Sequence, residues 1–222
     1  ADALPTIPAE VLAYCQRARE AFPGVPVIAG GVEASLRRIA HYDYWSDRVR
    51  RSILFDSKAD LLVYGMGERV VLEIAGRLRD GASVRDLRDL RGTAYRLGAR
   101  ESLPEDPSGG ETLELPSFEE AAADPLAFCR MTRLAHQETN PYNARRLLQR
   151  HGPEQVVVNP PALPLTREEM DRVYDLPYTR KPHPSYGGRK IPAWEVIRNS
   201  VQIMRGCFGG CTFCSITAHE GR

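Results

Sequence analysis

The chain has 222 residues, of which 42% are hydrophobic and 27% charged, so it can bury one large core or two smaller ones. Its 30 Lys and Arg residues almost balance its 29 Asp and Glu residues, which argues against a protein whose whole surface binds nucleic acid or anionic lipid. No apolar run is long enough to span a bilayer and no signal peptide opens the chain, so we expect a cytoplasmic protein without a membrane partner.

The first part of the chain alternates apolar runs that end in glycine with helical patterns. A helical pattern over residues 7–22 precedes "VPVIAGG", which leads into the helical "VEASLRRIAH". The apolar run in "ADLLVYGMGE" leads in the same way into "RVVLEIAGRLRDG". Buried strands that alternate with helices are typical of a doubly wound parallel sheet. We therefore predict an α/β, Rossmann-like domain over residues 1–115.

The middle of the chain, residues 116–178, is predicted to be a helical extension of this domain. Helices are expected over residues 117–138 and 142–150. Short strands are expected at "GTAYRL", before the extension, and at "QVVVN", within it. Two helix starts carry a capping box, in which Ser or Thr is followed three residues later by Glu: Ser117 with Glu120, and Thr166 with Glu169.

The last part of the chain is predicted to open a second domain. Prolines and paired glycines in "PYTRKPHPSYGGRKIPAWE" predict a linker over residues 179–196. The apolar spacing of "VIRNSVQIMRG" then predicts a strand over about residues 197–205. Residues 197–222 would form the start of this second domain. Because a lone helix opens the chain and nothing follows the final loop, we expect an internal piece of a longer protein.

Three of the five cysteines lie within eight residues, among glycines: Cys207, Cys211 and Cys214. An odd count and a clustered spacing favour metal binding or catalysis over a disulfide framework. The other two, Cys15 and Cys129, fall in helical patterns, where free cysteine is usually a buried packing residue.

The spacing Cys-x3-Cys-x2-Cys leaves three kinds of metal site to consider. Structural zinc usually needs four ligands from two separated knuckles, and here His219 is the one candidate for a fourth ligand. Ferredoxin-type carriers use four thiolates in a pattern that this chain does not have. Three thiolates can instead hold three irons of a 4Fe–4S cluster and leave the fourth iron open, since soft sulfur ligands suit such clusters.

The residues around the thiols favour the third kind of site. Gly206, Gly209 and Gly210 permit positive φ and a close approach of backbone amides to inorganic sulfide. Phe213 places an aromatic side chain directly before the last cysteine. This Cys-x3-Cys-x-aromatic-Cys motif resembles the signature of the radical S-adenosylmethionine (SAM) enzymes. The flanking "GGVEASLRRIAHYDYWSDRVRRSILFDSKADLLVYGMGE", "HPSYG" and "IMRGCFGGCTFCSITAHEGR" resemble the YgiQ-type branch of that superfamily, whose function is largely unassigned.

The resemblance implies a 4Fe–4S cluster on the three cysteines, with SAM chelating the open iron. An electron from the cluster would release methionine and a 5′-deoxyadenosyl radical, which abstracts hydrogen from a substrate that the sequence does not identify. Phe213 would pack near the adenine, and Gly209 and Gly210 would line the cofactor site. The fold would be a Rossmann-like domain followed by the first strand and cluster loop of a partial β/α barrel, with a reductase or a flavodoxin- or ferredoxin-type protein as electron donor.

The rival hypothesis is a non-catalytic docking or regulatory module whose cysteine loop holds a structural metal, either zinc or iron–sulfur. Domains of the expected Rossmann-like kind bind cobalamin in some radical SAM enzymes, and the sequence does not decide whether this one does. Neither "IAGG" nor "VYGMGE" matches a dinucleotide fingerprint, so tight strand-to-helix turns are the preferred interpretation.

Polar residues elsewhere offer weaker candidates. Glu33 and Glu68 follow strand-end glycines, where α/β sites open, and are candidates for a substrate cleft. The segment "RRIAHYDYWSDRVRRS" mixes aromatics and arginines as an RNA-facing surface does, but ion pairs are the favoured interpretation. Those pairs would join Asp43 and Asp47 to arginines of the same segment: Arg37, Arg38 or Arg48. We expect His183 and His219 to be polar packing groups.

Overall fold

The computed structural model describes residues 10–106, 108–211 and 213–221. The described residues form two compact units: one from those within 1–164 and 206–222, and the other from residues 165–205. These limits differ from the predicted domain boundaries, because the cysteine segment belongs to the same unit as the N-terminal α/β part. None of the helices in the described part of the chain has the length and apolar composition of a membrane span.

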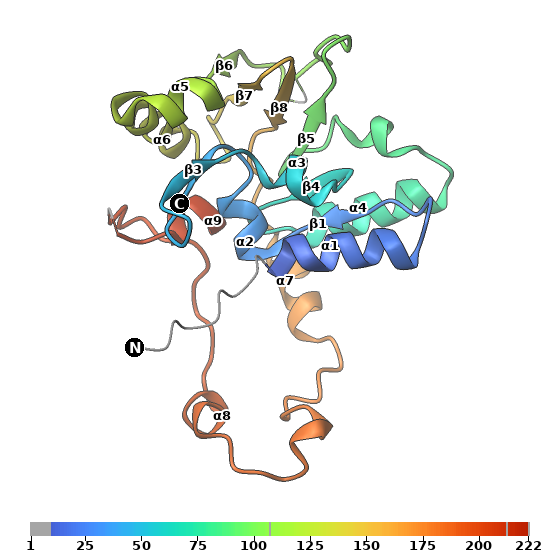
Figure 1. The fold of residues 1–222 in the computed structure, drawn as a ribbon. Coiled ribbons are helices and arrows are strands. Elements are labelled where there is room, and N and C mark those ends of the chain that lie inside the picture. Colours follow the sequence, from blue (N-terminus) through green and yellow to red (C-terminus); the bar gives the residue numbers. More distant parts are fainter. Residues whose placement is uncertain (1–9, 107, 212, 222) are drawn as a thin grey trace. The chain divides into compact units, whose positions relative to one another are not determined.

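An open sheet of six strands forms the centre of the larger unit (Figure 1). Its strands, in spatial order, are β1 (Ile28–Ala29), β4 (Leu61–Val63), β5 (Thr93–Leu97), β8 (Glu154–Val158), β7 (Arg146–His151) and β6 (Thr112–Glu114). Helices flank the sheet, which confirms the α/β class and is consistent with a Rossmann-like fold. A separate two-stranded hairpin, β2 (His41–Asp43) and β3 (Arg48–Arg50), follows the second helix.

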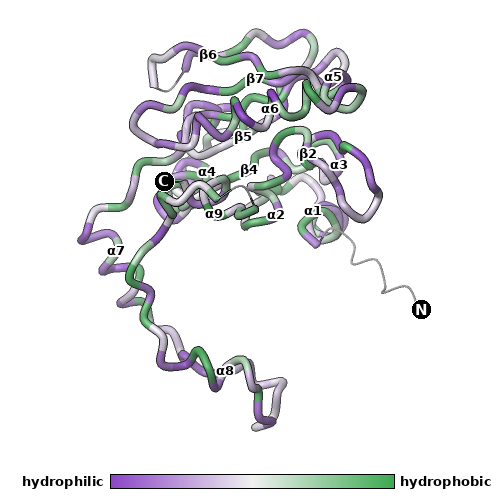
Figure 2. Tube along the Cα trace, turned by 90° about the vertical axis from the view of Figure 1, so that its left-hand side faces the viewer, coloured by the Kyte–Doolittle hydropathy of each residue, from purple (hydrophilic) through white to green (hydrophobic). Residues whose placement is uncertain are grey.

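The alternation of side chains along the strands creates a hydrophobic core on each face of the sheet. Leu62, Ala94 and Val156 point into one core, and their neighbours Leu61, Tyr95 and Val157 into the other. The second core is covered by α4 (Glu68–Arg79) and the 3-10 helix η1 (Val84–Leu87). The first is covered by α1 (Glu10–Ala21), α2 (Gly31–Leu36), α3 (Ile53–Ser57), α5 (Phe118–Ala123) and α6 (Pro125–Gln137). In Figure 2 the tube is strongly hydrophobic along β4, whose three residues are all buried.

Strand directions in the sheet are mixed. The predicted parallel pairing is observed for β1 with β4 and for β6 with β7, whereas β4–β5, β5–β8 and β7–β8 are antiparallel. Residues 80–92 connect α4 to β5. Strand β5 starts at Thr93, opposite Val63 at the end of β4, so the two strands are antiparallel. β7 and β8 form a hairpin closed by Gly152, whose φ of 60° suits the first central position of a two-residue turn.

The predicted helix over residues 142–150 is wrong, because Arg146–His151 is β7. The short segment "RRLLQRH" fits helical and strand periodicity alike. Pairing with the apolar β8 on one side and β6 on the other decides for the strand, and Leu147 lies opposite Val158. The predicted helical extension therefore supplies two strands of the sheet as well as α5 and α6.

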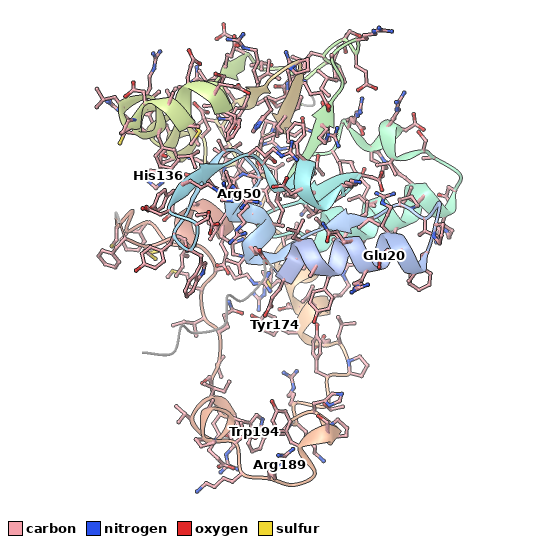
Figure 3. The ribbon with its side chains drawn as sticks, in the orientation of Figure 1. Glu20, Arg50, His136, Tyr174, Arg189 and Trp194 are labelled. Carbon is pink, nitrogen blue, oxygen red and sulfur yellow. The ribbon has the colours of Figure 1, made fainter. Side chains whose placement is uncertain are left out.

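The smaller unit contains α7 (Arg167–Tyr174), η2 (Pro184–Tyr186) and α8 (Pro192–Ile197). Within it, the Tyr174 hydroxyl donates to the Gln202 side chain at 3.0 Å, and Arg198 lies over the ring of Trp194. Tyr174 and Trp194 are labelled in Figure 3. The predicted strand over 197–205 is wrong: α8 occupies its start, and residues 198–205 form no strand. A strand needs a hydrogen-bonding neighbour, and none of the described residues pairs with this segment, in which Ile203 is 93% exposed.

Both predicted capping boxes are confirmed. Ser117 Oγ accepts from the Glu120 backbone amide at 3.2 Å, and Glu120 accepts from the Ser117 amide at 2.8 Å, at the start of α5. Thr166 and Glu169 exchange equivalent bonds at the start of α7. These bonds satisfy amides that have no partner within the helix.

A buried polar network joins β7 to the first core. The Gln149 amide donates to the Pro116 carbonyl at 2.9 Å, and its oxygen accepts from the Ala40 backbone at 2.8 Å. His151 Nε2 lies 3.2 Å from the same Gln149 oxygen, and the imidazole stacks on Phe118 at 5.5 Å between ring centroids. Burial above all lowers the pKa of His151 to about 4, so the ring is neutral at pH 7.

We predict that His151 makes the folded unit sensitive to acid. The unfolded chain binds the proton near pH 6.5 and the folded chain only near pH 4, so stability is lost as the pH falls through this window. In His151→Leu the loss between pH 7 and pH 4 should be smaller by on the order of 3 kcal/mol. Urea unfolding at a series of pH values measures this difference.

His183→Leu, which replaces an exposed imidazole in the smaller unit, is the matched control. The assignment fails if His151→Leu loses as much stability on acidification as the unmodified chain.

Candidate functional site

The cysteine loop, residues 206–215, closes onto the short helix α9 (Ile216–Glu220) that follows it. The Cys207 amide donates to the Gly221 carbonyl at 3.2 Å, and the Thr217 hydroxyl donates to the Cys207 carbonyl at the same distance. The Gly206 amide donates to the Glu220 carboxylate at 2.8 Å. These bonds tie the start of the loop to the helix at its end.

The glycines in the loop have different roles. Gly206 and Gly210 have φ of 75° and 59°, as predicted, whereas Gly209 lies outside that region. A Cβ atom at Gly209 would lie 3.3 Å from Cys207 Sγ and 3.7 Å from Cys211 Sγ, and the Gly209 amide donates to Cys207 Sγ at 3.4 Å. A side chain at 209 would crowd Cys207 Sγ and make an ordinary contact with Cys211 Sγ, so this glycine leaves room beside one sulfur and does not serve a positive φ.

Cys207 is half-buried, and Cys211 and Cys214 are exposed. In the described residues, no three His, Cys, Asp or Glu side chains are gathered closely enough to hold a metal ion, so the loop carries the three thiols without bringing them to one point. The donor set is made of soft sulfur ligands, which suits an iron–sulfur cluster better than a hard cation. Phe213, 91% exposed, leaves its ring free for a ligand.

Outside the loop, the two other cysteines differ. Cys15 is buried in the first core, as predicted, and burial above all raises its thiol pKa. Cys129 is exposed on α6, so its predicted burial is wrong. The helical pattern around it has its buried side at Met131 and Ala135, and Cys129 falls on the opposite side.

Helix α9 is anchored to α2 and to the end of β4. His219 Nδ1 lies 2.9 Å from Ser35 Oγ, which confirms that this histidine is a polar packing group. The Arg38 guanidinium donates to the Ala218 carbonyl at 3.2 Å. Gly65 leaves the necessary room, because a Cβ there would lie 3.2 Å from the His219 carbonyl oxygen. The sequence analysis missed this contact, since its partners are about 180 residues apart.

The two glutamates that follow strand-end glycines make contacts within the fold. Glu33 accepts from the Val11 amide at 2.8 Å and forms an ion pair with Arg37 at 3.3 Å. Glu68 also has a partner. Their assignment to a substrate cleft stays a prediction.

The basic and aromatic segment forms the β2–β3 hairpin. Asp43 accepts from Ser46 at 2.6 Å, and Asp47 accepts from the Tyr42 hydroxyl. Among the described residues, neither aspartate forms its predicted ion pair with an arginine. The rings of Tyr44 and Trp45 are exposed and meet edge to face, with centroids 5.9 Å apart. Whether this hairpin contacts nucleic acid stays a prediction.

Comparison with known proteins shows the family of the chain. A sequence model of the family described as Radical SAM N-terminal matches residues 8–200. The chain belongs to this radical SAM N-terminal family. Proteins designated UPF0313 are similar over 95% of the chain: one from Rhodopseudomonas palustris at 57% identity, one from Bradyrhizobium diazoefficiens at 56% and one from Vibrio vulnificus at 45%. The chain spans about a third of the length of these curated relatives, 33% in each case. No solved structure matches it.

We predict that Ser35 holds α9 in place. Ser35 is fully buried, accepts from the Gly65 amide at 3.3 Å and bonds His219, so Ser35→Ala removes both bonds with little change in volume. Amide hydrogen exchange in residues 216–220 should become roughly tenfold faster, as expected for the loss of about 1.4 kcal/mol. The core strands should exchange as before.

Ser46→Ala, which removes an exposed serine bonded to Asp43, is the control and should leave α9 unchanged. Unchanged exchange of α9 in Ser35→Ala would contradict the anchoring role.

Proposed function

We propose that this chain is the N-terminal part of a radical SAM enzyme, and that Cys207, Cys211 and Cys214 bind a 4Fe–4S cluster with one iron left open for SAM. The observation that carries the proposal is the donor set: three reachable thiols within eight residues, on a loop joined to a domain of the radical SAM N-terminal family. Three thiolates leave a cubane cluster one ligand short, and SAM can supply the missing ligands.

The loop residues support this role in distinct ways. The Gly209 amide donates to Cys207 Sγ, and such bonds to a ligand sulfur tune the potential of a cluster. Gly209 and Gly210 lack side chains, so the backbone can approach the cofactor closely. The exposed ring of Phe213 offers an apolar surface on which adenine can stack.

A cluster held by these cysteines would supply the electron for reductive cleavage of SAM to methionine and a 5′-deoxyadenosyl radical. The three cysteines hold the cluster as thiolates and fix its position relative to the Rossmann-like domain. Through the bonds from Thr217 to Cys207 and from His219 to Ser35, α9 limits the movement of the loop. We infer that the electron donor is a reductase or a flavodoxin- or ferredoxin-type protein. The substrate would be bound by the longer protein.

A second candidate function is a docking or regulatory module in which the cysteine loop holds a structural metal. The exposure of Cys211 and Cys214 favours it, because a partner protein could then supply the fourth ligand. Zinc loading, and the response of an iron–sulfur cluster to SAM, distinguish the two functions.

We predict that Cys211→Ala abolishes cluster binding and leaves the fold intact. After anaerobic reconstitution of the longer protein with iron and sulfide, the unmodified protein should hold about four irons per chain and show the visible absorption of a 4Fe–4S cluster. Cys211→Ala should lose most of this iron, while its circular dichroism stays unchanged. Cys129→Ala, which removes an exposed cysteine outside the loop, is the matched control and should load fully.

Retention of the cluster by Cys211→Ala would refute the ligand assignment. Tight binding of one zinc per chain without iron uptake would favour the structural-metal module. In the longer protein, addition of SAM should change the electron paramagnetic resonance signal of the reduced cluster, and an unchanged signal would argue against an open iron.

A further inference from the structure

A cavity of about 330 Å³ lies beside α9, between the α2–β2 segment and α6. Its walls are largely apolar, with Ile39 from one side, and Phe128, Met131 and Ala135 from α6. Ala218 of α9 closes part of the wall. A cavity of this volume is at the lower end of the range that accommodates small organic ligands, roughly 300–1,000 Å³.

Arg38 provides the one arginine or lysine side chain on this wall, and its exposed fraction is only 7%. One guanidinium nitrogen donates to the carbonyls of Ser35 and Ala218, and the guanidinium lies 4.5 Å from the centre of the Tyr64 ring. The buried Nε has no hydrogen-bond partner in the described residues. Burying a charge without a partner costs free energy, so an anion bound beside Arg38 would stabilise its guanidinium.

No carboxylate of the described residues forms an ion pair with Arg38, and no Asp or Glu lines the cavity. Glu138 shares a much smaller cavity of about 30 Å³ with Arg38, but it is held by Arg145 at 3.0 Å and by the Arg145 amide at 2.7 Å. That smaller space has room for about one water molecule.

One of the two histidines on the wall, His41, carries no charge at pH 7. Burial above all lowers the pKa of His41 to about 4, so its ring is neutral at pH 7. His136 lies on α6 near the hairpin that carries Arg50 (Figure 3) and also lines the cavity. Burial lowers the pKa of Arg38. An arginine side chain nevertheless keeps its proton at neutral pH.

We propose that this cavity binds a small organic anion with an apolar body, whose carboxylate pairs with Arg38. The apolar wall from α6 would take the hydrocarbon part, and the Arg38 guanidinium would supply charge-assisted hydrogen bonds. The bound molecule would touch Ala218, four residues after Cys214, on the helix that anchors the cysteine loop. That this anion is the substrate of the radical rests on the function proposed above, whereas its binding does not.

The test compares hexanoate with hexanamide, a neutral analogue of similar size, by isothermal titration calorimetry on the whole chain without iron or SAM. Hexanoate should bind at least roughly tenfold more tightly than hexanamide, because only the carboxylate satisfies the buried guanidinium. Arg38→Met should abolish this preference. Arg130→Met, which removes an exposed charge from the same helix as Phe128, is the matched control and should keep it.

Thr132→Trp keeps Arg38 and places a large ring at an exposed position on the cavity rim, so it should block hexanoate even if Arg38→Met fails to fold. Equal affinity for the two probes, or no binding of hexanoate, overturns the proposal. A preference for hexanoate that survives in a folded Arg38→Met or Thr132→Trp variant also overturns it. Since no iron is present, Cys211→Ala should bind hexanoate normally, which separates this result from the cluster experiment.

Discussion

The docking of α9 onto α2 is the contact on which the rest of the candidate site depends. A five-residue helix has too few internal hydrogen bonds to be stable alone, so its position comes from its contacts: His219 with Ser35, and Ala218 with Arg38. Gly65 makes the approach possible by having no side chain. Because Thr217 and Gly221 in turn bond Cys207, the same contact places the thiol-bearing loop against the α/β unit.

The same contact also builds the cavity wall. Arg38 donates to α9, lies over Tyr64 and lines the cavity between α2 and α6, so one buried guanidinium joins the cysteine loop, the sheet and the proposed anion site. Burying the Arg38 guanidinium without a carboxylate partner from the described residues costs free energy. Two carbonyls and a ring offset only part of this cost. In the proposed enzyme, this arrangement would hold a substrate anion against the segment that carries the cluster.

Local signals predicted well those elements whose stability is local. The capping residues Ser117 and Thr166 form the predicted bonds, because a capping box involves only four consecutive residues. The glycine-ended strands and the helices that follow them were also predicted, since their apolar patterns are long or repeated. The predictions for residues 142–150 and 197–205 were wrong for one reason. The first segment was predicted to be a helix and contains a strand, and the second was predicted to be a strand and forms none. A short apolar run is decided by whether a neighbouring strand is available, and β7 has two such neighbours whereas residues 198–205 have none among the described residues.

The sequence by itself determined the α/β class, the radical SAM family relationship and the three thiols, because residue types and short spacings are enough to identify them. Tertiary structure alone decided that Gly209 makes room for sulfur, that Cys129 is exposed and that Arg38 is buried beside a cavity, with no carboxylate partner among the described residues. The physical reason is distance along the chain. Arg38 and Ala218 are separated by 180 positions, and burial, charge pairing and cavities arise only when such distant segments pack together.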